Sequence, residues 1–258
     1  MAIRFYKYQG AGNDFIMIDD RTREFDLQKD TIAGLCDRRF GIGADGLILL
    51  QNDQDYDFRM VYFNADGGEG SLCGNGGRCA VRFAQDLGLI GGSTRFIAVD
   101  GEHVASLDEE VVHLGMSDVK GIETLDSAYF LNTGSPHYVE FVTDVDKTDV
   151  VGKGRAVRYG EFYGPRGGTN VNFAEVVEEN HLRVRTYERG VEDETLACGT
   201  GVTGCALVAA EIFGWEGPVK VEARGGELSV EFSRTGSGGV FSDICLTGPA
   251  RYVFQGSI

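Results

Sequence analysis

Short alternating runs of apolar and polar residues dominate the chain, and long helical periods are few. Such runs are typical of strands that bury one face. The predicted strands cover residues 3–9, 14–19, 47–50, 57–63, 94–99, 102–107, 111–116, 128–132 and 137–142. Two further runs read as hairpins: residues 170–188, turning at Glu179–Asn180, and residues 217–232, turning at Gly225–Gly226. The pattern predicts a fold rich in antiparallel sheet.

Three stretches have helical spacing instead. Residues 28–38 place Ile32, Leu35 and Cys36 on one face, and the stretch from Cys73 to about residue 87 repeats apolar side chains at helical intervals. A third helix is expected from Cys198 to about Phe213. Cys73 and Cys198 each precede a Gly-x-Gly and then the helical stretch, so each is expected at a helix N-terminus.

The order of these landmarks repeats. GAGNDFIMID, from Gly10, resembles NTGSPHYVEF, from Asn132, and CGNGGRCA resembles CGTGVTGCA. Gly12 and Cys73 are 61 residues apart, and Gly134 and Cys198 are 64 apart. The repeat predicts two domains of one topology. We therefore expect an α+β protein of two pseudo-symmetric domains, each a mainly antiparallel sheet wrapped around a central helix, with the active site in the cleft between them.

The expected domain bounds are 1–117, carrying Cys73, and 118–248, carrying Cys198. The C-terminal segment, about 249–258, could pack back onto the first domain. The N-terminus lacks the apolar core of a signal peptide, which favours a cytoplasmic protein. A formal net charge of −16 argues against nucleic acid and anionic membranes as partners, because both attract basic surfaces.

The six cysteines are too few for a disulfide scaffold in a chain of 258 residues. The pairs Cys73/Cys79 and Cys198/Cys205 lack the spacing of zinc ligands, so no metal is expected. Cys36, Cys79, Cys205 and Cys245 are interpreted as small buried residues. Cys73 and Cys198 differ, because they lie in polar, glycine-rich loops where a helix N-terminus favours thiolates and bound carboxylates.

Two thiols of this kind facing one substrate suit racemisation or epimerisation. One sulfur removes a proton from carbon, and the other returns a proton to the opposite face. The helix N-termini would hold the α-carboxylate and stabilise the charge that develops there. This chemistry needs no pyridoxal phosphate, and neither GAGNDF nor GIGADG completes a dinucleotide-binding pattern. No cofactor is expected.

These residues resemble the diaminopimelate epimerase family over nearly the whole chain. The matching segments are GAGNDF (10–15), DRRFGIGADGLI (37–48), YFNADGGEGSLCGNGGRC (62–79), GSPH (134–137), TNVNF (169–173) and YERGVEDETLACGTG (187–201). The resemblance implies a cofactor-independent isomerase that interconverts LL- and meso-diaminopimelate in lysine and peptidoglycan biosynthesis. It also implies a homodimer, although the sequence shows no dimer motif.

The resemblance also implies residue roles. Cys73 and Cys198 match the catalytic base and acid. Glu188 and Arg189 match the pair that reads the distal amino-acid head of the substrate, where a guanidinium can bind a carboxylate bidentately. The other matching substrate-binding positions are Asn13, Asn64, Asn170 and the helix-start residues Gly74, Asn75, Gly199 and Thr200.

Some positions have simpler interpretations or depart from the family. His137 could support the site or serve only as a structural hydrogen-bonding group, and Arg38 and Arg39 are interpreted as surface or packing charges.

The sequence also departs from the family pattern. Ser135 stands where many members carry Asn, and Gly46 stands where some carry Gln. The loop before Cys198 carries the acidic pair Glu192–Asp193 where shorter versions of the loop have Gly. Two alternatives stay open: a cysteine-pair racemase of another amino acid, such as proline or hydroxyproline, or a non-catalytic amino-acid-binding protein.

Overall fold

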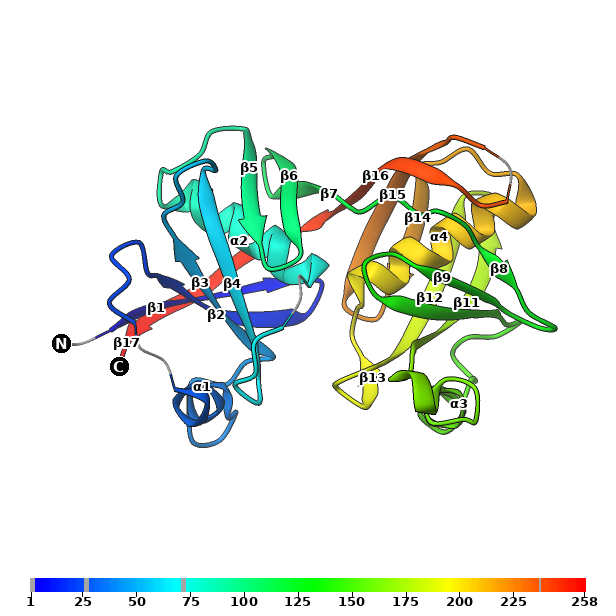
Figure 1. Ribbon diagram of the computed structural model, residues 1–258, viewed down its shortest axis with the longest axis horizontal. Coiled ribbons are helices and arrows are strands. Elements are labelled where there is room, and N and C mark those ends of the chain that lie inside the picture. Colours follow the sequence, from blue (N-terminus) through cyan, green and yellow to red (C-terminus); the bar gives the residue numbers. More distant parts are fainter. Residues whose placement is uncertain (1–2, 26–27, 71–72, 237) are drawn as a thin grey trace. The chain divides into compact units, whose positions relative to one another are not determined.

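The structure is a computed structural model that describes residues 3–25, 28–70, 73–236 and 238–258. The chain divides into two compact units, residues 1–114 with 248–258, and residues 115–247. Ser71 and Leu72, inside one of the family-like segments, lie outside the described residues. Figure 1 shows sheet strands curving around one long helix in each unit.

The first unit is an eight-stranded mixed sheet with two helices. Following the strand pairings, its order is β17-β1-β2-β3-β4-β5-β6-β7. The pairs β2/β3 and β4/β5 are parallel and the others antiparallel. The strands are β1 (Arg4–Gly10), β2 (Asn13–Asp19), β3 (Gly46–Gln51), β4 (Phe58–Asn64), β5 (Ser93–Ala98), β6 (Gly101–Asp108), β7 (Val111–Gly115) and β17 (Arg251–Ser257); the helices are α1 (Lys29–Cys36) and α2 (Gly74–Asp86).

The second unit repeats this topology. Its strands follow the order β8-β9-β10-β11-β12-β14-β15-β16, with β10/β11 and β12/β14 parallel, and β13 pairs with the end of β12. The strands are β8 (Glu123–Thr124), β9 (Tyr129–Asn132), β10 (Pro136–Phe141), β11 (Asn170–Glu178), β12 (His181–Glu188), β13 (Asp193–Thr195), β14 (Val219–Ala223), β15 (Gly226–Arg234) and β16 (Phe241–Pro249). The helices are α3 (Val150–Arg158), the 3-10 turn η1 (Gly164–Arg166) and α4 (Gly199–Phe213).

The long helix bridges equivalent parallel strands in both units, α2 between β4 and β5 and α4 between β12 and β14. Such a crossover brings the helix back onto its own sheet. Accordingly, α2 packs on β1 to β4, and α4 packs on β9 to β12, β14 and β15. Every residue of α4 from Gly201 to Ala210 is buried, as expected for a helix segment that lacks a charged face.

The two-unit α+β fold and the main elements predicted from the sequence are confirmed. The hairpin of β11 and β12 turns at Glu179–Asn180, and α4 ends at Phe213. The β14–β15 hairpin turns one residue earlier than expected, because Gly226 already pairs with Ala223. The expectation of one main helix in each unit overlooked α3, whose glycines and valines give a weak helical pattern.

No helix in the described ranges is long and apolar enough to cross a membrane.

Candidate active site

Cys73 is the N-cap residue of α2, directly before the first helical turn. Its backbone is extended (φ −92°, ψ 122°), and its carbonyl accepts the first helical hydrogen bond from Gly77 at 2.7 Å. Gly76 faces the core, where an added Cβ would lie 3.1 Å from Ile48 Cδ1. Glycine at this position therefore lets the helix start sit close against the sheet.

The Cys73 sulfur contacts the amide of Asn13, which in turn contacts that of Asn75, and the orientation of both amides is fixed by their other partners. The Cys73 thiol donates to Asn13 Oδ1 at 3.4 Å, and Asn75 Nδ2 donates to the same oxygen at 3.2 Å. Arg78 can only donate, and its Nη2 lies 2.8 Å from Asn75 Oδ1. The Asp45 carboxylate can only accept, and it receives Asn13 Nδ2 at 2.6 Å. Both amides are thus locked with the Asn13 oxygen toward the sulfur.

Arg78 is a fully buried cation inside α2. Its side chain is 0% exposed, and Nη1 donates to Gly74 O at 3.4 Å. Burial lowers the pKa of this guanidinium, while the nearby Cys79 and Cys73 sulfurs oppose that shift. Because a buried charge is costly without an opposing one, Arg78 favours negative charge at the neighbouring Cys73 loop.

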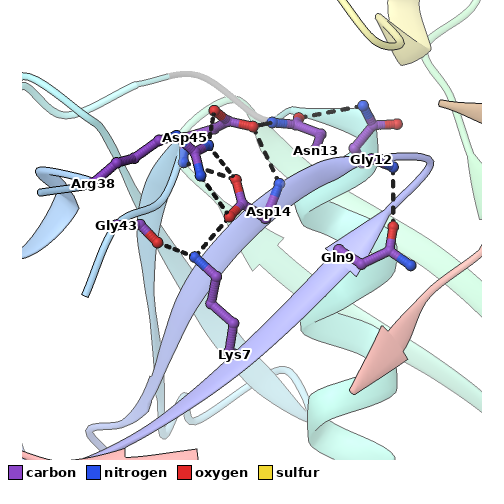
Figure 2. A network of polar contacts seen from close by, with 9 residues as sticks. Lys7, Gln9, Gly12, Asn13, Asp14, Arg38, Gly43 and Asp45 are labelled. Carbon is purple, nitrogen blue, oxygen red and sulfur yellow. Dashed lines mark hydrogen bonds and ion pairs between the residues drawn. The ribbon is translucent and has the colours of Figure 1, made fainter. Parts of the chain in front are cut away.

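An ionic network surrounds Asp45, the carboxylate that accepts from Asn13 Nδ2 (Figure 2). Arg38 Nη2 contacts Asp14 Oδ1 at 2.6 Å and Asp45 Oδ1 at 2.7 Å, and Lys7 Nζ lies 2.8 Å from Asp14 Oδ2. Burial alone would raise the pKa of Asp14, but Arg38 and Lys7 lower it to about 2. The interpretation of Arg38 as a surface or packing charge was therefore incomplete, since the arginine holds the carboxylate that orients Asn13.

Asn64, the last residue of β4, is exposed at the turn that follows the strand. Its backbone N–H donates to Gly68 O at 2.8 Å, and its carbonyl accepts from Gly67 N at 2.9 Å. Its side chain lies near Gly70, where an added Cβ would be 3.1 Å from Asn64 Nδ2.

Cys198 occupies the equivalent position at the start of α4. Its side chain is 7% exposed, and its carbonyl accepts from Val202 N at 2.8 Å. The sulfur lies 3.4 Å from the hydroxyl oxygen of Thr200. The Thr200 carbonyl in turn accepts from Thr133 Oγ1 at 3.0 Å, which ties the helix start to the β9–β10 turn. Gly199 is buried between these groups.

Asn170, at the start of β11, joins two loops of the predicted site. Its Nδ2 donates to Ser135 Oγ at 2.7 Å and to Pro136 O at 3.0 Å, and its Oδ1 accepts from Arg189 N at 2.9 Å. Ser135 therefore makes a hydrogen bond at the position where many family members carry Asn. Among the predicted residues of this unit, Asn170, Ser135 and Arg189 are brought together.

Asn172 is a buried polar residue that the sequence analysis did not single out, although it lies within the quoted TNVNF segment. Its Nδ2 contacts His137 Nδ1 at 3.1 Å, and its Oδ1 accepts from Thr186 Oγ1 at 2.9 Å. The same oxygen faces Gly201 so closely that an added Cβ there would lie 2.3 Å from it. Asn172 thus connects the sheet to the first turn of α4.

His137 is 0% exposed, and burial, aided by the nearby Arg189 charge, lowers its pKa to about 3. The imidazole is therefore neutral at ordinary pH, and Asn172 Nδ2 donates to its Nδ1. This environment favours the structural interpretation of His137 over a proton-carrying one.

Glu188 and Arg189 stand where β12 ends. Glu188 Oε2 accepts from Thr195 Oγ1 at 2.8 Å, and Arg189 is exposed. The two residues are consecutive in the chain, and Asn170 Oδ1 accepts from the Arg189 backbone at 2.9 Å. Their side chains are of the types that can bind an ammonium and a carboxylate.

The remaining cysteines behave mostly as expected. Cys36, Cys79 and Cys205 are buried, and burial raises their pKa, for Cys79 to about 12. Cys245 is only partly buried, because it lies on the half-exposed strand β16, so its interpretation as a core residue was too strong. Within the part of the chain that the structure describes, no three His, Cys, Asp or Glu side chains cluster as a metal ion requires.

Solved structures identify the fold class. A phenazine biosynthesis protein of the PhzF family from Bacillus anthracis superposes with a TM-score of 0.79 at 15% identity, covering 100% of this chain and 99% of that one. A hydroxyproline epimerase from Agrobacterium vitis gives 0.68 at 15% identity, covering 100% and 92%. The chain therefore has the fold of this PhzF-family protein and this hydroxyproline epimerase.

Sequence comparison narrows this class to a family. The diaminopimelate epimerase family model matches residues 5–118 and 129–253. A diaminopimelate epimerase from Flavobacterium psychrophilum is 48% identical over 99% of this chain and 100% of the relative. Those of Chlorobaculum tepidum and Aquifex aeolicus are 44% and 39% identical, each over at least 96% of both chains. The chain belongs to the diaminopimelate epimerase family, which confirms the resemblance seen in the sequence.

Proposed function

We propose that this protein interconverts LL- and meso-diaminopimelate by proton transfer at one α-carbon, with Cys73 and Cys198 as the acid/base pair. The observation that carries the proposal is that both cysteines cap equivalent helices, α2 and α4, in a chain that belongs to the diaminopimelate epimerase family. Each thus lies at a helix N-terminus, where the helix dipole and the backbone N–H groups favour a thiolate and a bound carboxylate.

The reaction moves one proton at a time. A thiolate takes the α-proton as the C–H bond breaks, and the resulting carbanion takes a proton from the other thiol on the opposite face. The product leaves with inverted configuration, and the enzyme is left with its proton on the first sulfur. The mechanism requires both sulfurs to reach one α-carbon. The backbone N–H groups of Gly74, Asn75, Gly199 and Thr200 would hold the carboxylate and stabilise the developing charge.

The distal half of the substrate would be bound by residues of the second unit at the end of β12. In this proposal Arg189 pairs with the distal carboxylate and Glu188 with the distal ammonium, and Asn170 holds the Arg189 backbone. Asn13 and Asn64 supply amide groups from the first unit. Ser135 and His137 have supporting roles, through Asn170 and Asn172 respectively.

We also infer that the protein is a homodimer. Strand β17 pairs with β1, and its Tyr252, Val253 and Phe254 are 47%, 51% and 43% exposed. Exposed apolar side chains on an edge strand are typical of an interface. A cytoplasmic location suits the mechanism, because both thiols have to stay reduced.

The test is substrate-specific exchange at the α-carbon. In deuterated water the protein should incorporate deuterium at the α-carbon of LL-diaminopimelate and form the meso isomer, and it should leave L-proline and trans-4-hydroxy-L-proline unchanged. Turnover of either cyclic amino acid would favour a related racemase. Tight binding of diaminopimelate without exchange would indicate an amino-acid-binding protein.

A further inference from the structure

We propose that Glu192 and Arg158 form a clasp that fixes the turn carrying Glu188 and Arg189, and that this clasp gives the enzyme its selectivity for a substrate with a second amino-acid head. The inference rests on the proposed function for the identity of that substrate. Neither residue is one of the expected catalytic or substrate-binding positions. Both are positioning residues, since they act through the turn.

The turn joins β12 to β13 and spans Arg189–Glu192. It is closed by a backbone bond from Glu192 N to Glu188 O at 2.8 Å, next to the Glu188–Asp193 strand pair. Glu192 adopts a left-handed conformation with φ +61°. That conformation is unfavourable for a residue with a Cβ, so side-chain contacts have to stabilise it.

The Glu192 carboxylate provides those contacts. Its Oε1 accepts from Gly190 N at 3.0 Å and from Arg158 Nη2 and Nε at 3.0 and 3.2 Å. Its Oε2 accepts from the hydroxyl of the buried Tyr187 at 3.2 Å. One side chain thereby bonds the middle of the turn, the strand before it and the neighbouring helix.

The carboxylate is held in its ionised form. Burial alone would raise the pKa of Glu192, but hydrogen bonds from Gly190 N, Tyr159 and Arg158 outweigh burial and lower it. Bonds to an ionised acceptor are about twice as strong as neutral ones, which favours a rigid turn.

Arg158 connects this turn to the segment that holds the Arg189 backbone. It is the last residue of α3, and its side chain is 14% exposed. The guanidinium lies on Gly168, where an added Cβ would be 1.6 Å from Nη1. Gly168 leads directly into Thr169 and Asn170, whose Oδ1 accepts from Arg189 N. The guanidinium therefore contacts both segments that set the position of Arg189.

A fixed turn places the Glu188 carboxylate and the Arg189 guanidinium before substrate arrives. Ordering such a turn on binding would otherwise cost conformational entropy and weaken recognition of the distal head. The α-carbon chemistry at Cys73 and Cys198 does not use this turn. Loss of the clasp should therefore raise KM and reduce selectivity while leaving kcat nearly unchanged.

The experiment compares Glu192→Ala, Glu192→Gln and Glu192→Gly with the control Glu211→Gln. Glu211 pairs with Arg234 at 2.6 Å on the other side of the same unit, at a similar exposure. Each variant is assayed with LL-diaminopimelate and with 2-aminoheptanedioate, which lacks the distal ammonium. Hydrogen exchange of the backbone amides of residues 189–192 is measured in parallel.

We expect Glu192→Ala to raise KM for diaminopimelate about tenfold and to lower its preference over the analogue by a similar factor, with kcat within about threefold of wild type. Glu192→Gln should have a KM and a preference between those of wild type and Glu192→Ala, because glutamine keeps a hydrogen-bond acceptor but not the charge. Glu192→Gly should resemble Glu192→Ala although it relieves the backbone strain. The turn amides should exchange faster in all three and stay protected in Glu211→Gln.

Either of two results would overturn the proposal. One is a Glu192→Ala enzyme whose KM and preference match the control. The other is a Glu192→Gly enzyme with wild-type KM, since the backbone alone would then order the turn. A wild-type protein without epimerase activity would instead refute the proposed function. In that case unchanged exchange of the turn amides in Glu192→Ala would still refute the clasp, and faster exchange would support it.

Discussion

The two units share one topology but surround their cysteines with different chemistry. Beside α2, the Cys73 thiol donates to Asn13 Oδ1, an amide oxygen that can only accept. Beside α4, the Cys198 sulfur lies against the Thr200 hydroxyl, which can donate to a thiolate. The duplicated fold thus supplies two equivalent helix starts, and the side chains make them unequal. Unequal surroundings of this kind affect which of the two sulfurs holds a proton more readily.

A second difference lies one turn into each helix, and at Cys73 it opposes the first, because a buried cation favours the thiolate whereas the Asn13 oxygen favours the thiol. Arg78 in α2 and Thr203 in α4 occupy matching positions, and each donates to the carbonyl four residues before it, Gly74 O or Gly199 O. Both side chains are fully buried. The first helix therefore carries a buried positive charge near its cysteine, and the second carries a neutral hydroxyl.

A third difference lies at the start of the equivalent strands β3 and β11. Asn170 starts β11 and bonds Ser135 and Arg189. Gly46 starts β3, and an added Cβ there would lie 2.6 Å from both Phe63 O and the Tyr62 ring. Gly46 is therefore required by close packing, and the equivalent amide exists in the second unit only.

The largest expected effect comes from removing either sulfur. Cys73→Ala and Cys198→Ala should each lower epimerisation by about 10²–10⁴-fold, because each removes one proton-transfer group. Steady-state turnover and α-deuterium incorporation from each isomer measure the loss. We expect both variants to fold, as judged by circular dichroism. Near wild-type turnover in either variant would rule out the two-thiol mechanism.

The next effect concerns the buried cation. Arg78→Thr gives α2 the residue that α4 carries at the matching position, Thr203. The variant therefore tests whether the buried charge distinguishes the two thiols. Without the guanidinium the Cys73 thiolate loses a stabilising charge, and its alkylation by iodoacetamide at neutral pH should slow about tenfold. Mass spectrometry of the two cysteine peptides measures this, with Cys198 as the internal control. An unchanged ratio of the two rates would show that Arg78 has only a packing role.

A smaller effect is expected from the direct partners of the sulfurs. Asn13→Ala removes the acceptor of the Cys73 thiol and should speed its alkylation by about threefold, because a hydrogen bond to the neutral form is lost. Thr200→Val removes the hydroxyl beside Cys198 and should slow alkylation there by a similar factor, whereas Thr200→Ser should not. Shifts of the same sign in both variants would contradict the assigned asymmetry.

Much of the fold could be predicted from the sequence, because the spacing of apolar residues and the positions of turn-forming residues agree with the structure. The Asn180 turn, the Gly-x-Gly helix starts and the alternating strands all follow local rules. Helix α3 could not be predicted in this way. It forms because Gly154 lets it approach Tyr187, where an added Cβ would lie 2.4 Å from Tyr187 Cβ, and that is a tertiary contact with no local pattern.

The polar networks were harder to predict than the cysteines. Cys73 and Cys198 stand in short motifs that point to their chemistry. Arg38, by contrast, reaches Asp14 and Asp45 only because β2 and β3 pair in parallel, which no local spacing reveals. From the sequence alone, a charged residue whose partner lies on another strand is interpreted as a surface charge, because the strand pairing is not known.

The smallest effect tests the ionic network of the first unit through pH. Asp14 has a folded pKa of about 2, below its usual value of 3.8, so its ion pairs contribute stability above pH 3.8 that is lost as pH falls toward 2. Asp14→Asn should cost on the order of 1–2 kcal/mol of unfolding free energy at pH 6, and the difference from wild type should shrink below pH 3. Urea denaturation at several pH values measures this, with the exposed Asp126→Asn as the control. A difference that persists unchanged at pH 2.5 would mean that the carboxylate's charge does not stabilise the Arg38 and Lys7 contacts. The second unit contributes a pH dependence of its own, because burial lowers the pKa of His137 from its usual 6.5 to about 3 and the unfolded chain therefore takes up a proton first as pH falls through that interval. Wild type and both variants share this loss, so it cancels in the difference that the experiment measures.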